Sequence, residues 1–544
     1  MIASKEKDPV RTFLAQLERE HRTEARLEAR TNEAFRLARV DDRTKHFQPP
    51  HRSGDAAIHE SWPMMTARVR EEFLNNAQFK KAVGGLKDLV IGPGLMTFSS
   101  PFDPWMDLSR ASLADFDEGF RFALEADDWF EEWAGDPKQC DVEGKKALFD
   151  MQALSFSEMM LSGDALLVEC RRHDPGQITP LCYQMIEREQ LDTTKDRPAA
   201  PGQNKIIGGI ELDDSNREVA FHVFDAHPFD DFTPFSSSSK SSRISAKRVI
   251  HLFSFLRPSQ SMGATWLSAM GQTSLDRDRF LGAELQTAIK AALLALIVKR
   301  ENPSGGSLSL DDGTTAEDEF GNAEIVLGST TLGIDIGLKD SVDLVESTRP
   351  NSTLAPFVDV IDHDSASAVE MSYYRFTGRY EKSSYTSVRG AHLDDDAHVK
   401  PMQNWFGRKC AIPIRQRFNA MAAASGRYKT VTPSQFLKDL RRYQRFDAIG
   451  AGRELLDPEG ETESAISKLR SGLTTLKIEC AKRQLHWIKV LRQIAMENRV
   501  CDLLGVVLDH TKGQGGQTEG NTRSARHAGE SRQETRERIR SEEY

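Results

Sequence analysis

A long helical pattern between residues 264 and 300 limits the fold more than any other feature of the chain. The stretch is rich in alanine and leucine and contains no proline. At 1.5 Å per residue, a helix of about 35 residues would extend about 50 Å, which is more than a single globular core requires. Because a long helix depends on its neighbours for stability, the pattern predicts packing partners in the same chain or in other subunits.

The same pattern does not describe a membrane span. Glu284, Gln286 and Lys290 interrupt its most apolar part, and the longest unbroken apolar run, Ala291 to Val298, is far shorter than the ~20 residues that a span needs. The first residues of the chain also lack the apolar run of a secretory signal. We therefore expect a protein with no membrane contact.

Length and composition exclude several other classes. With 544 residues the chain is too long for one hydrophobic core, so we expect roughly two to four packed units. Six cysteines without a Cys-x-x-Cys pair argue against a disulfide scaffold or a zinc ribbon and indicate a reducing compartment. A net charge of −10 argues against a protein that binds DNA over its whole surface.

That net charge is concentrated in one segment directly after the helical pattern. Residues 301–346 contain eleven acidic residues and one basic residue, Lys339, so this segment alone carries −10 and the rest of the chain is neutral. The segment is also rich in Gly, Ser and Thr. It is either a solvated loop and hairpin, or a protruding acidic tip that meets a basic partner or repels DNA.

Hydrophobic patterns elsewhere predict a mainly helical α+β fold with an antiparallel sheet. Helices are expected over most of residues 60–135 and at 143–161, and a further helix begins near Thr353, with helices continuing to about residue 510. The expected strands lie at 165–170, 181–186, 206–212, 219–223 and 249–255.

The sequence contains no convincing catalytic or cofactor-binding motif. It has no phosphate-binding loop, HExxH, GxSxG or GxGxxG pattern at the required place. Asp362, His363 and Asp364 could suggest a metal or acid–base group, but consecutive helical residues point in different directions, which favours an ordinary polar surface. We therefore expect no cofactor, no metal site and no enzymatic activity.

Five collinear stretches carry a resemblance to a known family. They are Arg68–Leu95 with RVR, NN and GPG; Phe130–Gly163 with WA, CD and SG; His251–Leu285 with RPSQ and AEL; Ser383–Arg389, SSYTSVR; and Ile449–Glu497 with DPEGE, GLTTLK and IAMENR. Together they resemble the lambda-like portal proteins of tailed bacteriophages. Thr265 and Trp266 stand where proline is usual in that family, and the acidic segment and the N-terminal arm have no counterpart in it.

The resemblance implies a domain order. Portal proteins form a cyclic oligomer, usually of twelve subunits, at one capsid vertex. The implied parts are a charged N-terminal arm (1–54), a wing with the sheet (55–263), a first stem helix (264–300), an acidic clip (301–351), a second stem helix (352–372), a channel loop with a return to the wing (373–393), a helical crown (394–510) and a disordered tail (511–544).

The resemblance also implies a function and partners. Terminase drives double-stranded DNA through the ring during packaging, and the DNA later leaves through the same hole during ejection. The implied partners are further copies of the chain, the large terminase subunit, major capsid and scaffolding proteins, head-completion or tail proteins, and DNA held without sequence specificity. The implied location is the virion, after assembly in the bacterial cytoplasm.

Two groups of candidate site residues follow from this mapping. A conduit must not grip DNA, because each neutralised phosphate adds binding that translocation has to break. Acidic walls with a few basic rings would keep a duplex centred and mobile, although salt bridges are an equal alternative for each basic residue. The channel candidates are Lys290, Lys299, Arg300, Lys382 and Arg389, and the partner-docking candidates in the clip are Asp311, Asp312, Glu317, Asp318 and Glu319.

Two other functions remain as alternatives. The first is an enzyme that acts on nucleic acid, either a packaging ATPase or a nuclease, although the missing phosphate loop argues against it. The second is a ring-forming scaffold unrelated to viruses.

Overall fold

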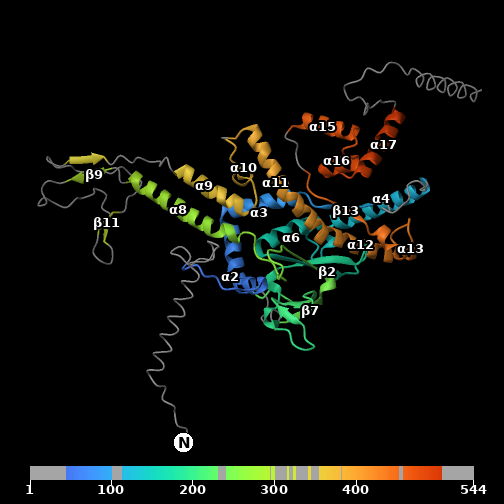
Figure 1. The fold of residues 1–544 in the computed structure, drawn as a ribbon, viewed down its shortest axis with the longest axis horizontal. Helices are drawn as coiled ribbons and strands as arrows, with labels where there is room; N and C mark the ends of the chain where they lie inside the picture. Colours follow the sequence, from blue (N-terminus) through green and yellow to red (C-terminus); the bar gives the residue numbers. More distant parts are fainter. Residues whose placement is uncertain are drawn as a thin grey trace, which may run out of the picture. The chain divides into compact units, whose positions relative to one another are not determined.

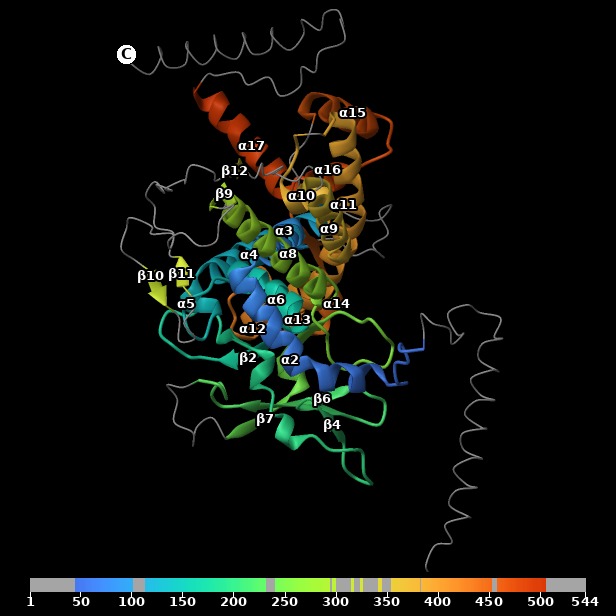
Figure 2. The same cartoon turned by 90° about the vertical axis from the view of Figure 1, so that its left-hand side faces the viewer.

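The computed structural model describes residues 45–100, 113–230, 240–293, 296–299, 315–317, 323–325, 341–344, 354–381, 383–452 and 457–504 (Figures 1 and 2). The chain divides into two compact units: the first is Met1–Ser464 with Lys482–Gln484, and the second is Ala465–Ala481 with Leu485–Tyr544. Most of the expected N-terminal arm and the whole expected C-terminal tail lie outside the described residues.

Helices open the described part of the first unit. Ser53 caps α2 (Gly54–Asn75) by accepting a hydrogen bond from the Ala56 amide, and Asn76 caps α3 (Ala77–Val90) in the same way. α4 (Leu113–Gly135), α5 (Pro137–Cys140) and α6 (Leu148–Ser162) follow. The helix expected at 143–161 starts five residues later, because Gly144 has a positive φ and the Asp141 carboxylate binds the next two backbone amides.

The strands after α6 are antiparallel, as expected from the sequence, but they form two sheets rather than one. One has the order β3-β2-β8, and the other has the order β4-β5-β6-β7. The single strand expected at 206–212 is two strands, because Gly208 and Gly209 adopt positive φ and turn the chain back on itself. The strands are β2 (Asp164–Arg171), β3 (Leu181–Ile186), β4 (Lys205–Ile207), β5 (Ile210–Leu212), β6 (Glu218–Phe224), β7 (Ser241–Ser245) and β8 (Val249–Phe253).

The long helix is shorter than its sequence pattern. α8 spans Ser268–Leu293, and the strand β9 (Leu296–Lys299) follows it. The expectation of helix through residue 300 is therefore wrong, because the last residues pair with β12 (Ser341–Leu344) in an antiparallel ladder. At the other end, the backbone of Trp266 and the hydroxyl of Thr265 both bond to the Met160 carbonyl, which holds this stretch outside the helix.

Little of the acidic segment is described. Besides the β9–β12 ladder, it contains the antiparallel pair β10 (Thr315–Glu317) and β11 (Ala323–Ile325). Short strands of this kind agree with the hairpin that the sequence suggests after residue 300. The ladder pairs β9, just before the acidic segment, with β12 near its end. The segment therefore departs from the rest of the chain and rejoins it at the same place.

The second expected stem helix is α9 (Leu354–Ala368), which packs against α8 (Figure 1). α10 (Tyr373–Thr377) and α11 (Tyr385–Phe406) come next. The expectation of a loop through residue 393 is wrong for its second half, because Ser384 caps α11 through the Ser387 amide and helix begins at Tyr385. Gly407–Ala411 is a π-helical turn that continues into α12 (Ile412–Ala424).

One large hydrophobic cluster joins distant parts of the first unit. Trp133 of α4 packs on Phe418 of α12, and Phe156 of α6 packs on Phe406 of α11. Beneath them Arg415 pairs with Asp127 at 2.6 Å, and both side chains are buried. Residues 394–449, which we expected in a separate crown, therefore share the core of the expected wing.

The remaining elements are short or belong to the C-terminal helices. α13 (Pro433–Lys438) and α14 (Leu440–Tyr443) add Phe436 and Tyr443 to the large hydrophobic cluster. The strand β13 (Phe446–Ile449) pairs with β1 (Met96–Ser99). α15 (Pro458–Arg470), α16 (Leu476–Lys482) and α17 (Trp487–Leu504) confirm that the chain is helical near its C-terminus. The described helices include none with the length and apolarity of a membrane span.

Candidate nucleic-acid interface

Aromatic and basic side chains concentrate between α9 and α11. The sequence YYRFTGRY begins at Tyr373, and α11 adds Tyr385 and Arg389 after it. We call residues 373–381 and 383–389 the tyrosine–arginine segment. Arg379, Tyr380, Tyr385 and Arg389 are exposed, whereas Phe376 is buried and fixes α10 to the main cluster.

Three aspartates hold this segment in place. Asp395 of α11 accepts hydrogen bonds from the backbone amide and hydroxyl of Ser372, at 2.8 and 3.0 Å, and lies 3.5 Å from the guanidinium of Arg375. Asp359 of α9 accepts hydrogen bonds from the Tyr373 hydroxyl and from Arg379, both at 3.0 Å. The third aspartate, Asp362, is buried one turn further along α9.

Asp362 joins four parts of the chain. Its Oδ1 accepts hydrogen bonds from the side-chain Nε2 of Gln78 in α3 at 2.6 Å and from the Nε of Arg277 in α8 at 2.9 Å. Its other oxygen lies 3.8 Å from Arg379. The interpretation of Asp362 as ordinary polar surface is therefore wrong: the carboxylate ties α8 and α9 to α3 and to the tyrosine–arginine segment.

Aromatic stacking and protonation complete the arrangement. The rings of His363 and Tyr373 stack with centroids 3.9 Å apart, and those of Tyr374 and Tyr380 stack at 6.0 Å. Burial and the hydrogen bond to Asp359 raise the pKa of Tyr373. Burial opposes the charge of Arg379, but its hydrogen bond to Tyr373 and the nearby carboxylates raise its pKa overall. The phenol thus stays neutral and the guanidinium stays charged at all ordinary pH values.

The chemistry of this surface suits phosphate contact without base recognition. Guanidinium groups attract phosphate oxygens regardless of sequence, and tyrosine rings offer stacking or van der Waals surface. Asp359 and Asp362 lie 3.0 and 3.8 Å from Arg379 and compensate its charge, so little of that positive charge is available to attract phosphate. Arg389 is exposed and has no ion pair among the described residues, so its guanidinium is more available to a phosphate than that of Arg379.

The structure brings few of the predicted site residues together. Lys290 lies near the C-terminal end of α8, Lys299 in β9 opposite Ser341, and Arg389 on α11 rather than in a loop. Glu317 ends β10, opposite Ala323. The other candidates lie outside the described residues: Arg300, Asp311, Asp312, Asp318, Glu319 and Lys382.

Sequence reasoning missed the residues that organise the site. Asp359, Asp362 and Asp395 resemble surface carboxylates in the sequence, and their partners lie up to 284 positions away. The one local signal was the interleaving of Tyr and Arg at 373–380, a composition that often marks nucleic-acid contact.

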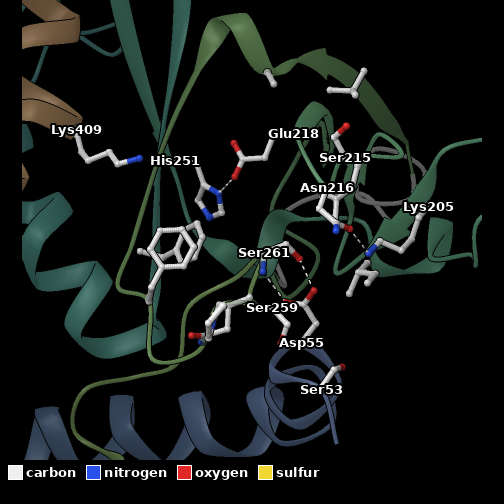
Figure 3. A pocket seen from close by; sticks show the side chains of 18 of the residues that line it. Ser53, Asp55, Lys205, Ser215, Asn216, Glu218, His251, Ser259, Ser261 and Lys409 are labelled. Atoms are coloured by element: carbon white, nitrogen blue, oxygen red, sulfur yellow. Dashed lines mark hydrogen bonds and ion pairs between the residues drawn. The ribbon is translucent and has the colours of Figure 1, made fainter.

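A pocket lies in the expected wing (Figure 3). It is a pocket of about 1110 Å³ between the four-stranded sheet, the start of α2 and residues 255–261. Its charged groups are largely satisfied inside the chain: Asp55 accepts two hydrogen bonds from Ser261, and Lys205 donates to Asn216. Groups of three or more potential metal ligands are absent from the residues that the structure describes.

His251 closes one wall of this pocket within a buried charge network. Its Nδ1 lies 2.8 Å from Glu218 and its Nε2 lies 3.1 Å from Asp164, which also pairs with Arg188 at 2.5 Å. Burial disfavours the imidazolium, but hydrogen bonds to the two carboxylates outweigh it and raise the pKa of His251 to about 9. Each charged group of this network is paired with a group of opposite charge, and the network links β8 to β2 and β6. Its role is therefore structural.

Comparison with known proteins identifies the family. A model of the phage portal protein lambda family matches residues 41–403, which include α2 through most of α11. The probable portal protein of Halomonas phage phiHAP-1 is 26% identical over 70% of this chain and 71% of its own length. Portal protein B of Escherichia phage lambda is 20% identical over 83% of this chain and 86% of its own length.

Solved structures give a weaker similarity. The neck of an empty gene transfer agent particle matches with a TM-score of 0.38 and 11% identity, over 75% of this chain and 90% of that chain. The family assignment depends on the sequence match, which covers well over half of the residues, and this family is structural rather than enzymatic. The chain belongs to the lambda family of phage portal proteins.

Proposed function

We propose that this chain is the subunit of a ring at one capsid vertex, through which double-stranded DNA enters during packaging and leaves during ejection. The observation that carries the proposal is the family match through residues 41–403. Its partners would be terminase, capsid and scaffolding proteins, and head-completion or tail proteins, and its location the virion after assembly in the host cytoplasm.

The architecture supports specific roles for its parts. The antiparallel pair of α8 and α9 would form the stem, and the acidic segment that leaves and returns at the β9–β12 ladder would form the clip. With a net charge of −10 on each copy of this segment, a ring would present strong negative charge there. Such a surface repels the DNA backbone and attracts basic partner proteins.

The tyrosine–arginine segment would face the DNA path. It follows the second stem helix directly, and Asp359, Asp362 and Asp395 hold it rigid against α3, α9 and α11. A rigid surface with few unpaired cations contacts a passing duplex without binding it tightly, because binding strength rises with each phosphate neutralised.

Native mass and electron micrographs of the purified protein test the ring. Twelve copies of the 61.0 kDa chain would give a particle of about 730 kDa with a central hole. A ring of eleven or thirteen subunits would support the same function. A closed dimer without a hole would contradict it.

The DNA contact has its own test. In an assembled ring, Arg389→Gln should weaken retention of a short duplex and reduce the slope of affinity against salt concentration. Arg171→Gln, an exposed change at the end of β2 in the wing, is the matched control. Equal effects of the two substitutions would remove Arg389 from the DNA path.

A further inference from the structure

Two of the six cysteines lie directly opposite each other in the three-stranded sheet of the expected wing. In the antiparallel ladder of β2 and β3, Cys170 is paired with Cys182, and the register is unbroken over six residue pairs. Opposite residues of a ladder project from the same face of a sheet, so the two thiols are neighbours on one face. The other four cysteines all lie in helical segments and have no ladder partner.

The hydrogen-bond pattern of the ladder gives the spacing of this pair. The Arg172 amide donates to the Pro180 carbonyl at 2.9 Å, which makes residues 172 and 180 a hydrogen-bonded pair. Because hydrogen-bonded pairs recur at every second position, Cys170 and Cys182 are also such a pair, with Cα atoms about 5.5 Å apart. Disulfides span Cα separations of about 4.4–6.8 Å. The backbone therefore permits a bond between these cysteines.

A bond at this position should be easy to reduce. The Cβ atoms of opposite residues in a sheet lie about 4.5–5.5 Å apart, whereas those of a disulfide lie about 3.8 Å apart. The two strands must therefore move toward each other by roughly 1 Å when the bond forms, and strain of this kind makes a disulfide more reducible.

The two thiols differ in access and are slow nucleophiles. Cys170 is half-buried, whereas Cys182 is buried. Burial raises the pKa of both thiols, that of Cys182 to about 11, although Arg248 near Cys170 and Arg172 near Cys182 favour the thiolate. Because the thiolate is the attacking species in disulfide exchange, the pair should oxidise slowly at neutral pH and faster as pH rises.

We propose that Cys170 and Cys182 form a redox-sensitive pair, with free thiols in the reducing host cytoplasm and a disulfide in the virion outside the cell. Cytosolic thiols are kept reduced, whereas disulfides persist in an oxidising environment. The inference goes beyond the proposed function and rests on it only for this change of compartment. The bond itself depends on the β2–β3 ladder alone.

The step is a two-electron oxidation by a small-molecule disulfide such as oxidised glutathione. The Cys170 thiolate, which is the more accessible, attacks one glutathione sulfur and releases the first reduced glutathione. The Cys182 thiolate then attacks the Cys170 sulfur of this mixed disulfide and releases the second. The two thiol protons pass to the two glutathione molecules, so one disulfide breaks as another forms.

The bond would stiffen the hairpin that connects β2 and β3. Arg427 donates hydrogen bonds to the carbonyls of Gln177 and Ile178 in this hairpin, and the Gln139 side chain accepts one from the Ile178 amide. The hairpin thus holds α5 and the chain after α12 against the sheet. A disulfide would close the loop 170–182 and restrict the unfolded chain, which stabilises the folded state.

Mass spectrometry of the full chain tests the bond without any substitution. The protein would be incubated with oxidised glutathione or with excess reduced glutathione, blocked with N-ethylmaleimide and digested with trypsin. Trypsin cuts after Arg171 and Arg172, so Cys170 and Cys182 lie on different peptides and their linked product is unambiguous. We expect the linked peptide as the main product in oxidised glutathione, at least tenfold less of it in excess reduced glutathione, and faster formation at pH 8.5 than at pH 7.

Urea denaturation measures the effect of the bond on the fold. Oxidation should move the urea midpoint of the wild-type chain upward, and dithiothreitol should reverse the shift. Cys170→Ser should abolish both the linked peptide and the shift. Cys501→Ser, at a half-buried position of α17, is the matched control and should retain both. A shift of equal size in Cys170→Ser would assign it to other cysteines and overturn the inference.

Two results for the wild-type chain would also overturn it. Thiols that stay free in oxidised glutathione, or a chain that carries only glutathione on Cys170, would show that the strands hold the two sulfurs apart. A bond that forms equally in excess reduced glutathione would be a permanent disulfide rather than a redox-sensitive one. Native mass tests the ring separately, so the proposed function would stand in both cases. A protein that forms the bond but never a ring would support the pair and contradict the proposed function.

Discussion

The α4–α12 core and the α8–α9 pair solve the same problem, the packing of helices, in different ways. Between α4 and α12, aromatic rings and the Asp127–Arg415 pair are almost completely buried within one subunit. Between α8 and α9, buried charge and apolar contact are confined to the end near α3, and the far end of α8 is exposed. The first region is buried within one chain, whereas the second leaves the far end of α8 exposed.

The largest expected effect is at the buried pair of the α4–α12 core. Arg415→Met removes the cation that compensates Asp127 and that lies 4.3 Å from the centre of the Phe130 ring. Breaking a buried pair from one side should lower the free energy of unfolding by about 3–5 kcal/mol, measured by urea denaturation.

Arg417→Met, on the same helix, is the matched control. Arg417 is half exposed and lies 3.5 Å from Glu169, so its loss should cost less than about 1 kcal/mol. Similar losses at both positions would show that the core does not depend on the buried pair.

Two phenylalanines compare the regions directly. Phe418 is fully buried against Trp133, and its replacement by Ala should cost about 3–5 kcal/mol of unfolding free energy. Phe357 is half exposed on α9, so Phe357→Ala should cost less than about 1 kcal/mol in the isolated subunit. Equal losses in the two variants would mean that the α8–α9 pair is already complete within one subunit.

How far the sequence predicted this molecule depends on the range of the interactions. Local patterns identified most of the helices and strands, because hydrophobic periodicity acts over a few residues. The end of α8 was missed because Leu296–Lys299 becomes a strand only through pairing with Ser341–Leu344. A helical pattern cannot reveal a pairing partner that lies more than 40 positions away in the sequence.

The candidate site was harder to predict for the same reason. Asp362 lies among other acidic residues in the sequence, and only the fold brings Gln78 and Arg277 to it. The boundary expected at residue 393 failed because Phe406 and Phe418 complete a core begun by α4 and α6. Family resemblance implies an order of domains, but it does not show which residues share a core.

The buried imidazole of the wing predicts a smaller, pH-dependent effect. Because the pKa of His251 is raised to about 9 in the folded chain from its ordinary 6.5, its stabilisation is complete below about pH 6.5 and is lost as pH rises through 9. The free energy of unfolding should fall by on the order of 2–3 kcal/mol between about pH 6.5 and 9.5.

The control for this titration is His251→Asn, measured over the same pH range. The variant should be less stable than the wild type at the acidic end of the range, and its free energy of unfolding should lack the decrease that depends on His251. The difference in unfolding free energy between the two proteins should therefore narrow as pH rises. A constant difference at every pH would show that His251 is neutral in the folded chain.

The smallest expected effect tests whether charge at one end of the α8–α9 pair holds the two helices together. Asp362→Asn keeps the shape of the side chain and an acceptor for Gln78 but removes the charge that binds Arg277, 18% exposed at its side chain. We expect a loss of about 1–2 kcal/mol, seen as faster amide hydrogen exchange in α8 and α9 with little change in α4 and α12. Asp364→Asn, two positions away and exposed, should change neither. If amide exchange accelerates equally in all four helices, Asp362 stabilises the whole first unit, and the α8–α9 pair does not open independently of the α4–α12 core.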